Sequence, residues 1–496
     1  MESGKDLEAG SSSSLAFANG TRYNLNKPDG VPASRNLAQF TAENASQFAL
    51  NGGNNTCRIP VSSQQFLDIK NSVLTFDLTC KSAVSEMVLD GGAACVLDRV
   101  RILQGGREIE RIDSYNLCHC VLNQYASNVS DMVVQRAQEG APGYVLTGSK
   151  EPSQTFGTGE SPPTNSMTLA DGTTLTGASI VGLTVANVAG GKGYSCKQAD
   201  QLEKDVKRTY SFGLKCGWFN PATAKMLPPN VGWSLELTFS PAANCFQTLD
   251  ATPNYIVENV MLEVPQVMIT DPASMARLNA RIAQGVSWKA TTFSHHSTTV
   301  TQGAGSKNLS IGEKARRLKG LFTVFRILAD VTDENKYKLS NRTVQLIDNY
   351  YYQIGSSQYP QQQVNLVCDP AKPSGGTAIP LRLGIGSNSG MNVSQAYNEC
   401  LRLFKGINNM GSIQISMENY AQSVLNTAQG LIAIDLQAYS DNSLSSGIDT
   451  VSNNLAVNLK CVTNTVQGAI DYQADTYGVA EIIFHVDENG QLFSEQ

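Results

Sequence analysis

The chain has 496 residues, of which 41% are hydrophobic and 7% aromatic. That is enough apolar material for one or two sizeable cores and too much for wholesale disorder. Its 37 Lys and Arg against 43 Asp and Glu give a net charge of −6, which argues against a basic nucleic-acid-binding protein. Charged residues make up only 16% of the chain, which excludes a coiled coil, because that fold needs long charged heptads.

Targeting signals and cysteine usage bear on the compartment. Residues 1–14 contain no basic segment followed by an apolar stretch, so we expect no signal peptide. No apolar run approaches the roughly 18 residues of a membrane span. The best candidate, residues 177–191, is too short and too rich in Gly, Thr and Asn. The 11 cysteines, an odd number with irregular spacing, predict reduced and mostly buried thiols in a protein made in the cytosol.

The chain begins with a polar segment. Residues 1–50 are rich in Ser, Asn, Ala and Gly, which predicts an extended arm or a disordered tail. This arm is not Arg-rich: its cations are Lys5, Arg22, Lys27 and Arg35.

Short β-like runs follow the arm. In residues 71–80 apolar side chains alternate with polar ones, which is the period of a strand buried on one face. An apolar run at 96–103 leads into Gly105-Gly106, which predicts a hairpin turn. Residues 114–125 switch to the spacing of a helix. The apolar face of this helix is Leu117, Val121, Leu122 and Tyr125, and its candidate caps are Asp113 and Ser114.

A long stretch without clear periodicity comes next. Residues 127–205 are rich in Gly, Ser, Thr and Pro, and we interpret them as a long loop with one or two short hairpins, one of them near residues 180–188. An insertion of this length usually carries function or surface contacts. Strands are predicted again at 210–216 and 235–239, and the loop at 241–253 marks a domain boundary.

The second half repeats the β-rich texture. Its predicted strands are 255–269, 318–328, 344–354, 431–439, 455–462 and 479–486, and its predicted helices are 275–282 and 393–404. Mostly strands with a few helices in the connections indicate a sandwich or barrel architecture. The expected organisation is an N-terminal arm at 1–50, a first domain at 51–250 and a second domain at 251–496.

The two halves share an order of features. A hairpin at 102–110 precedes a helix that contains Tyr115-Asn116, and a turn at 354–359 precedes a helix that contains Tyr397-Asn398. After each helix we expect a pair of strands separated by a loop: 211–216 with 234–239, and 431–439 with 455–461. This order favours a duplicated sandwich. The alternative is that any two β-sandwiches look alike at this resolution.

Histidine and cysteine offer few metal ligands. Cys118-His119-Cys120 is the most tempting cluster, but neighbours on a helix point about 100° apart and cannot surround one zinc ion. We interpret it as buried thiols beside a polar surface histidine. His295-His296 lies on an extended stretch, where neighbouring side chains face opposite sides. The sequence also lacks the His-x-His of a cupin metal site, so we predict no metal site.

The glycine-rich segments do not match a phosphate or nucleophile motif. Residues 384–390 lack the Lys-Ser/Thr ending of a phosphate-binding loop, and Asn388 stands where a nucleophile elbow needs serine. Residues 190–193 fail the same template at Gly193. We interpret residues 384–390 as a flexible loop before the helix at Val393, and we expect no cofactor site at either segment.

Charged residues leave one catalytic possibility open. A glycosidase needs two carboxylates that can be far apart in sequence, and Asp77, Glu236 and Asp435 each lie on a predicted strand. Solvated outer faces or ion pairs between packed sheets are the simpler explanation of these acids, so we predict no catalytic residues. The one basic cluster could contact an acidic partner or phosphate, but we interpret it as the solvated start of a strand. It consists of Lys314, Arg316, Arg317 and Lys319.

An ordered set of sequence blocks resembles a known family. The blocks are Arg58–Ser62 with Phe66–Ile69 and Leu74–Phe76, Arg101–Glu110 followed by Tyr115-Asn116, Met226–Pro229 before Trp233–Phe239, and Tyr352–Pro360 followed by Tyr397-Asn398. Together they resemble the double jelly-roll major capsid proteins of polinton-like viruses, virophages and related large DNA viruses.

The resemblance implies an all-β fold of two tandem eight-stranded jelly-roll β-sandwiches with short connecting helices and long loops. It also implies a homotrimer of pseudo-hexagonal outline that tiles an icosahedral shell, with neighbouring capsomers and with penton and minor capsid proteins as partners. The long loops at 127–205 and 360–392 would form outward towers and lateral contacts. The protein would be made in the host cytoplasm and reside in the virion shell. Its negative charge fits a shell without sequence-specific nucleic acid contacts, and contact with an internal membrane stays open.

Three functional hypotheses follow. The first is a self-assembling major capsid protein that is not an enzyme and needs no cofactor. The second is a minor capsid, spike or lectin-like jelly roll that binds host glycans, which exposed Trp and Tyr around one pocket would favour. The third is a glycosidase or metal-dependent jelly-roll enzyme, which would need two acids within reach or a histidine cluster.

Overall fold

The computed structural model describes most of both halves of the chain. The described residues are 33–49, 55–82, 87–127, 134–135, 137–141, 143–144, 167–168, 174–175, 196–197, 201–221, 226–248, 250, 252–301, 303, 305–333, 336–344, 347–366, 393–408, 420, 429–438, 447–461 and 471–496.

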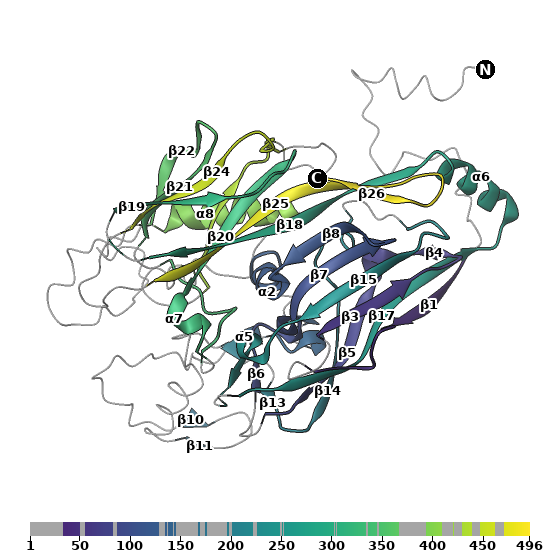
Figure 1. The fold of residues 1–496 in the computed structure, drawn as a ribbon, viewed down its shortest axis with the longest axis horizontal. Coiled ribbons are helices and arrows are strands. Elements are labelled where there is room, and N and C mark those ends of the chain that lie inside the picture. The colour runs from purple at the N-terminus through teal and green to yellow at the C-terminus, as the bar shows by residue number, and fades with distance from the viewer. Residues whose placement is uncertain are drawn as a thin grey trace.

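Two antiparallel sheets form the first jelly roll (Figure 1). One has the order β1 (Ala33–Thr41), β17 (Tyr255–Ile269), β5 (Val73–Cys80) and β14 (Lys207–Phe212), with β2 (Gln47–Ala49) and β4 (Phe66–Leu67) also paired to β17. The other has the order β3 (Thr56–Val61), β15 (Trp233–Phe239), β7 (Leu97–Gln104) and β8 (Arg107–Asp113).

The second jelly roll has the same two-sheet design. Its first sheet has the order β18 (Val286–Val300), β25 (Tyr472–Val486), β20 (Leu318–Ile327) and β23 (Ile432–Asp435), with β26 (Leu492–Glu495) on β25. Its second sheet has the order β19 (Gly305–Ile311), β24 (Leu455–Cys461), β21 (Ile347–Ile354) and β22 (Ser357–Asn365).

The strand order shows that one topology occurs twice. If the eight main strands of each roll are numbered along the chain, one sheet reads 1-8-3-6 and the other 2-7-4-5 in both halves. That is jelly-roll topology. The predicted all-β fold of two tandem eight-stranded jelly rolls is therefore confirmed. The predicted repeat has the same order, because α2 (Tyr115–Tyr125) follows the fifth strand of the first roll and α8 (Ser394–Asn408) follows the fifth strand of the second.

Local sequence explains the strands that were predicted. In β5 the side chains of Leu74, Phe76, Leu78 and Cys80 are fully buried, as their alternation indicated. Gly105 and Gly106 join β7 to β8 with φ of +56° and +83°, a left-handed pair that glycine adopts without steric cost. The bounds of β17 are those of the predicted run at 255–269.

The pairing of β17 disagrees with the domain boundary expected near residue 250. β17 pairs with β1 and β5, so its hydrogen bonds place it in the first roll, although the boundary near residue 250 put it in the second. Periodicity identifies a strand but not its partner, which explains the error. We propose that the first roll ends at Ile269, where the chain continues through α6 (Pro272–Ile282) into β18.

Three further expectations differ from the structure. Residues 33–49, predicted as arm, supply β1 and β2. The strands expected to pair after each helix lie in opposite sheets: β14 pairs with β5, and β15 with β3 and β7. The same holds for β23 and β24. The 15-residue strand β18 was missed because Ser, Thr and His occupy many of its positions.

The remaining helices and strands are short. α5 (Ala242–Cys245) and α7 (Leu328–Val331) are one-turn helices, and β6 (Met87–Leu89) is flanked by β13 (Gln201–Leu202) and β16 (Phe246–Thr248). The described part of the insertion holds the two-stranded pairs β10 (Met167–Thr168) with β11 (Thr174–Leu175), and β9 (Gly143–Tyr144) with β12 (Cys196–Lys197). The hairpin predicted near 180–188 lies outside the described residues, as does most of the 360–392 loop, whose first residues belong to β22.

Candidate functional site

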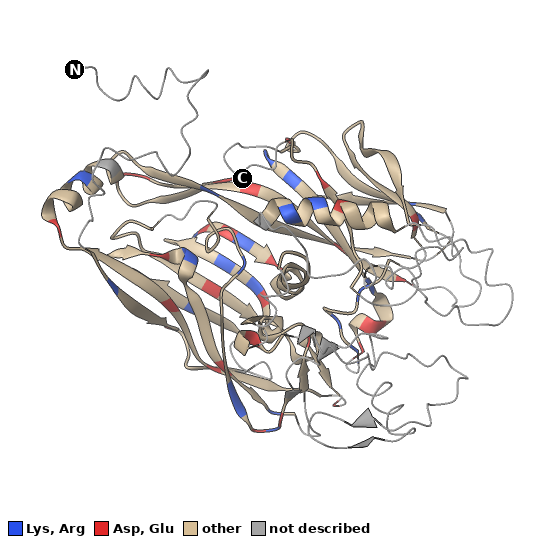
Figure 2. Cartoon of the chain, turned by 180° about the vertical axis from the view of Figure 1, so that it is seen from behind, with Lys and Arg blue, Asp and Glu red and all other residues tan. Residues whose placement is uncertain are grey.

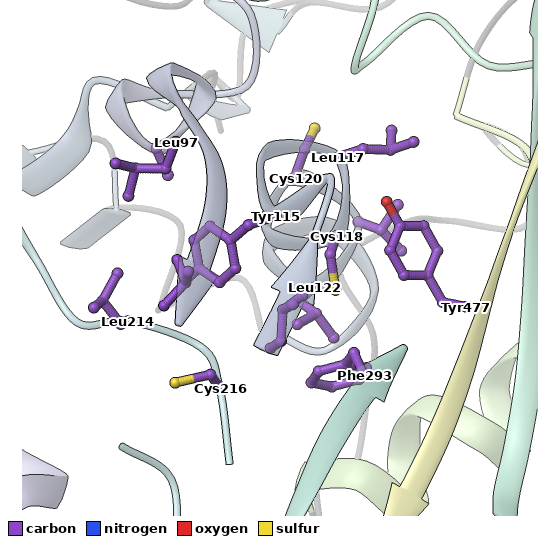
Figure 3. Close-up of a cluster of buried hydrophobic side chains, with 14 of the residues drawn as sticks. Leu97, Tyr115, Leu117, Cys118, Cys120, Leu122, Leu214, Cys216, Phe293 and Tyr477 are labelled. Carbon is purple, nitrogen blue, oxygen red and sulfur yellow. The ribbon is translucent and has the colours of Figure 1, made fainter. Parts of the chain in front are cut away.

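Helix α2 lies at the joint between the two rolls. Figure 3 shows it with Tyr115 and Leu214 of the first roll on one side and Phe293 and Tyr477 of the second roll on the other. All eleven residues of α2 are buried. The sequence predicted one buried face, but the other faces are buried as well, partly by the first roll, as at His119, and partly by the second, as beside Tyr477. Ser114 occupies the cap position with φ of 46°, but its side chain makes no capping hydrogen bond.

Buried carboxylates tie the two rolls together. Glu110 of β8 accepts hydrogen bonds from the backbone N–H groups of Gly217 and Trp218, at 2.7 and 2.8 Å, and from the Thr292 hydroxyl of the second roll at 2.6 Å. Burial raises the pKa of Glu110. Sequence reasoning did not identify Glu110. The only signal was an acid beside Ile109 and Ile112 in a strand.

Asp90 forms a second tie of the same kind. Its carboxylate accepts the N–H groups of Leu339 and Ser340, at 2.5 and 3.1 Å, and the Ser340 hydroxyl at 2.6 Å. Burial raises the pKa of Asp90 as well.

Gln104 adds a third tie: it donates to the Gly490 carbonyl at 3.0 Å and accepts the Leu492 N–H at 2.6 Å. Directional contacts at three places restrict how one roll can rotate on the other.

An aromatic cluster fills the same joint. The three tryptophans of the chain meet here: the ring of Trp218 lies 5.3 Å from that of Trp233 and 5.6 Å from that of Trp288, between centroids. Phe484 of β25 closes the cluster at 5.2 Å from Trp218. All three indoles are at most 4% exposed. They are packing residues of the joint and not an aromatic platform for a ligand.

His119 is not the surface histidine that the sequence predicted. It is 1% exposed, because the ring of Phe212 and the segment that carries Glu139 cover it. Its Nε2 lies 2.9 Å from Glu139, and its Nδ1 lies 3.0 Å from the Tyr115 hydroxyl. Burial lowers the pKa of His119. The neighbouring Cys118 and Cys120 are buried thiols, as predicted.

His295 and His296 contact different carboxylates. His295 Nε2 lies 3.0 Å from Asp475, whereas His296 Nε2 lies 3.0 Å from Glu313. The extended backbone of β18 therefore separates the two imidazoles, as the sequence indicated. Within the described residues, no group of three or more His, Cys, Asp and Glu is placed to hold a metal ion.

The three strand acids do not form a carboxylate pair. Asp77, Glu236 and Asp435 lie in three different sheets, on β5, β15 and β23. Burial alone would raise the pKa of Asp77, but hydrogen bonds from Thr209 and Asn259 lower it. Glu236 pairs with Arg101 at 2.6 Å, within one sheet. Asp435 accepts the Gln437 N–H at 3.1 Å, and burial raises its pKa.

The basic cluster at 314–319 is divided among separate partners. Arg316 pairs with Glu495 at 2.5 Å and Arg317 with Glu481 at 3.6 Å. Lys319 is 8% exposed, which corrects the expectation of a solvated strand start, and burial lowers its pKa. Figure 2 shows the wider pattern, with basic and acidic residues side by side on the strands of the first roll. Arg101, for example, contacts both Glu108 and Glu236.

The remaining sequence candidates add little. The glycine-rich segments 384–390 and 190–193 lie outside the described residues. In the part of the chain that the structure describes, no helix is long and apolar enough to cross a bilayer. All nine cysteines with described side chains are buried and none of them forms a disulfide within the described residues, in agreement with the predicted burial of the thiols.

Comparison with known proteins shows which solved structures share this architecture. No protein-family model matches the chain, and no curated protein does. Solved structures match over almost the whole length. The major capsid protein of mavirus aligns over 97% of this chain and 95% of its own, with 10% identity and a TM-score of 0.51. The Faustovirus major capsid protein aligns over 96% and 95%, with 9% identity and a TM-score of 0.52. A chain of the Sputnik virophage aligns over 97% and 93%, with 10% identity and a TM-score of 0.55. These likenesses show that the chain has the double jelly-roll fold of those proteins.

Proposed function

We propose that this chain is a major capsid protein of an icosahedral double-stranded DNA virus and that it resides in the virion shell. The observation that carries the proposal is the extent of the structural likeness. The alignment with the mavirus major capsid protein covers 97% of this chain, so it includes both rolls and their placement on each other. A single jelly roll is widespread, whereas a tandem pair in this arrangement is a more specific architecture.

The joint supports a role as a rigid building unit. Glu110, Asp90 and the tryptophan cluster bind one roll firmly to the other. Each chain contains two similar jelly rolls, so three chains around a three-fold axis would place six similar rolls around that axis. We propose that the chain forms such homotrimers, with a pseudo-hexagonal outline, and that these contact neighbouring capsomers, penton proteins and minor capsid proteins.

The same residues argue for a structural role and not an enzymatic one. Asp77, Glu236 and Asp435 each have their own partners and lie in separate sheets. His295 and His296 are committed to different carboxylates. A shell protein would act by assembly, without a cofactor and without sequence-specific nucleic acid contacts.

The glycan-binding alternative loses part of its support. Exposed Trp and Tyr around one pocket would have favoured it, but all three tryptophans of the chain are buried in the joint. A glycan screen that monitors tryptophan fluorescence should therefore give no spectral change.

The native mass of the purified protein tests the proposal. We expect light scattering on a sizing column to give three times the chain mass of 53.3 kDa, and negative-stain images of that peak to show hexagonal outlines. A monomer that persists across the accessible concentration range would overturn the capsomer assignment. A trimer without a hexagonal outline would contradict the proposed arrangement of the rolls.

A further inference from the structure

Three residues of α2, Tyr115, His119 and Asn123, form a closed ring of hydrogen bonds with Glu139 and Lys215. Lys215 Nζ donates to Asn123 Oδ1. Asn123 Nδ2 donates to Glu139 Oε1 at 2.9 Å, and His119 Nε2 lies 2.9 Å from Glu139 Oε2. His119 Nδ1 lies 3.0 Å from the Tyr115 hydroxyl, which accepts the backbone N–H of Lys215 at 2.7 Å. The ring therefore begins and ends at Lys215.

The donors and acceptors of this ring can be assigned without conflict. The Tyr115 oxygen accepts from the Lys215 backbone, so its own hydrogen is available for His119 Nδ1. His119 is then the tautomer with its hydrogen on Nε2, and that hydrogen points to Glu139. Burial lowers the pKa of His119, which favours this neutral form. Glu139 thus accepts from two donors, as a carboxylate does.

The ring holds three groups that together can form an amide bond. Lys215 supplies a primary amine, Asn123 a carboxamide, and Glu139 a carboxylate on the nitrogen that would leave. The hydrogen bond holds Lys215 Nζ beside the carboxamide of Asn123, and holding two reacting groups together lowers the entropic cost of a reaction between them. Asn123 is 4% exposed and Glu139 is 2% exposed, so little water reaches the carboxamide. The function of a shell protein requires none of this chemistry.

We propose that Lys215 and Asn123 join through an intramolecular amide crosslink, with Glu139 as the proton-transfer group. Lys215 Nζ attacks Asn123 Cγ, the Nζ–Cγ bond forms, and the Cγ–Nδ2 bond breaks. The ammonium of Lys215 and the carboxamide become a secondary amide and an ammonium ion, so atoms and charge balance and no oxidant is needed. Glu139 transfers two protons in turn from Nζ to Nδ2: the first frees the lone pair of Lys215 for the attack, and the second leaves Nζ as the new bond forms, so that Nδ2 departs as ammonium.

The ring also explains why these residues are positioned so firmly. The backbone of Lys215 is held by Tyr115, and the carboxylate of Glu139 is held by His119. Tyr115 and His119 are therefore positioning residues, whereas Glu139 contacts the reacting carboxamide directly. The crosslink would join helix α2 to the segment after β14 across 92 residues of chain. Closing a loop of that length restricts the unfolded chain and favours the folded state.

Peptide mapping of the natively purified, full-length protein tests the crosslink. Trypsin cannot cleave after a modified Lys215, so we expect one branched peptide that joins residues 112–136 to residues 209–225. Its mass should be lower by one ammonia molecule than the sum of the two linear peptides. Recovery of the free peptide 209–215 together with unmodified 112–136 from the wild-type protein would overturn the proposal, and this measurement depends on no variant.

Two variants identify the reacting groups. Lys215→Arg keeps the positive charge but has no primary amine, and Glu139→Gln keeps the shape but cannot carry the proton. We expect both to have the full sequence mass, whereas the wild type lacks one ammonia. Ammonia loss that persists in Lys215→Arg would place the reaction elsewhere, for instance at a cyclising asparagine, and would contradict the crosslink. The test is independent of assembly, because a monomer could form the same bond.

Discussion

Tyr477 of the second roll donates a hydrogen bond of 3.0 Å to the backbone carbonyl of Ser114 in the first, across 363 residues of chain. Ser114 precedes α2 and has the left-handed φ of 46°. The ring of Tyr477 also stacks on Phe322, with the centroids 4.9 Å apart. The second roll therefore helps to hold the start of the helix that the first roll supplies.

Removing the Tyr477 hydroxyl should weaken this joint measurably. We expect Tyr477→Phe to cost about 1 kcal/mol of the free energy of unfolding, the usual contribution of one hydrogen bond. Tyr477→Ala should cost roughly 3–5 kcal/mol, because it also leaves a cavity in the stacked cluster. Urea unfolding followed by circular dichroism measures both. Tyr351→Phe, at a half-exposed tyrosine of β21, is the matched control and should change little. Equal losses at positions 477 and 351 would contradict the prediction.

Asp475 is a buried carboxylate of the second roll whose contribution to the stability of the fold can be measured. It is fully buried and accepts hydrogen bonds from Arg326 Nε and Nη2 at 3.1 and 2.7 Å, with His295 Nε2 at 3.0 Å. Burial alone would raise the pKa of Asp475, but Arg326 and His295 lower it well below its ordinary value of 3.8. A lowered pKa means that the carboxylate stabilises the fold above that ordinary value. The contribution is lost progressively as the pH falls from that ordinary value through the lowered pKa.

We therefore expect Asp475→Asn to cost roughly 3–5 kcal/mol at neutral pH, because it leaves the buried Arg326 without its countercharge. The gap between wild type and variant should shrink as the pH falls below 3.8. Denaturant unfolding at a series of pH values measures it. Glu495→Gln removes the exposed partner of Arg316 and should cost less than about 1 kcal/mol at any pH. A gap at Asp475 that stays constant into strong acid would rule out this account.

The buried thiols predict a selective labelling pattern. Burial raises the pKa of Cys57 and Cys120 to about 12, and thiolate is the reactive form. We expect the nine buried cysteines of the described residues to resist alkylation in the native protein and to react in urea. Peptide mapping after labelling with iodoacetamide measures this, and Cys196 and Cys368, whose side chains are not described, are left out. Native labelling of Cys57 or Cys120 would be incompatible with the structure.

Residues with a clear local pattern were predicted well. The alternation in β5, the Gly105-Gly106 turn and the run that became β17 all depend on neighbours within a few positions, so the sequence carries their signal directly. β18 was missed because Ser, Thr and His occupy many of its positions, and the buried partners of these side chains lie far away in the sequence. Thr292, for example, binds Glu110, and His295 binds Asp475.

The order of strands and helices, and with it the duplicated β architecture, was encoded in the sequence itself, since strand periodicity and turn residues act over short distances. Only the tertiary structure decided which strands pair, which moved β17 into the first roll and β1 out of the arm. It alone decided that His119 is buried and that Lys215, Asn123 and Glu139 meet. Those contacts join residues up to 92 positions apart, and the folding of the chain back on itself, rather than local preference, brings them together.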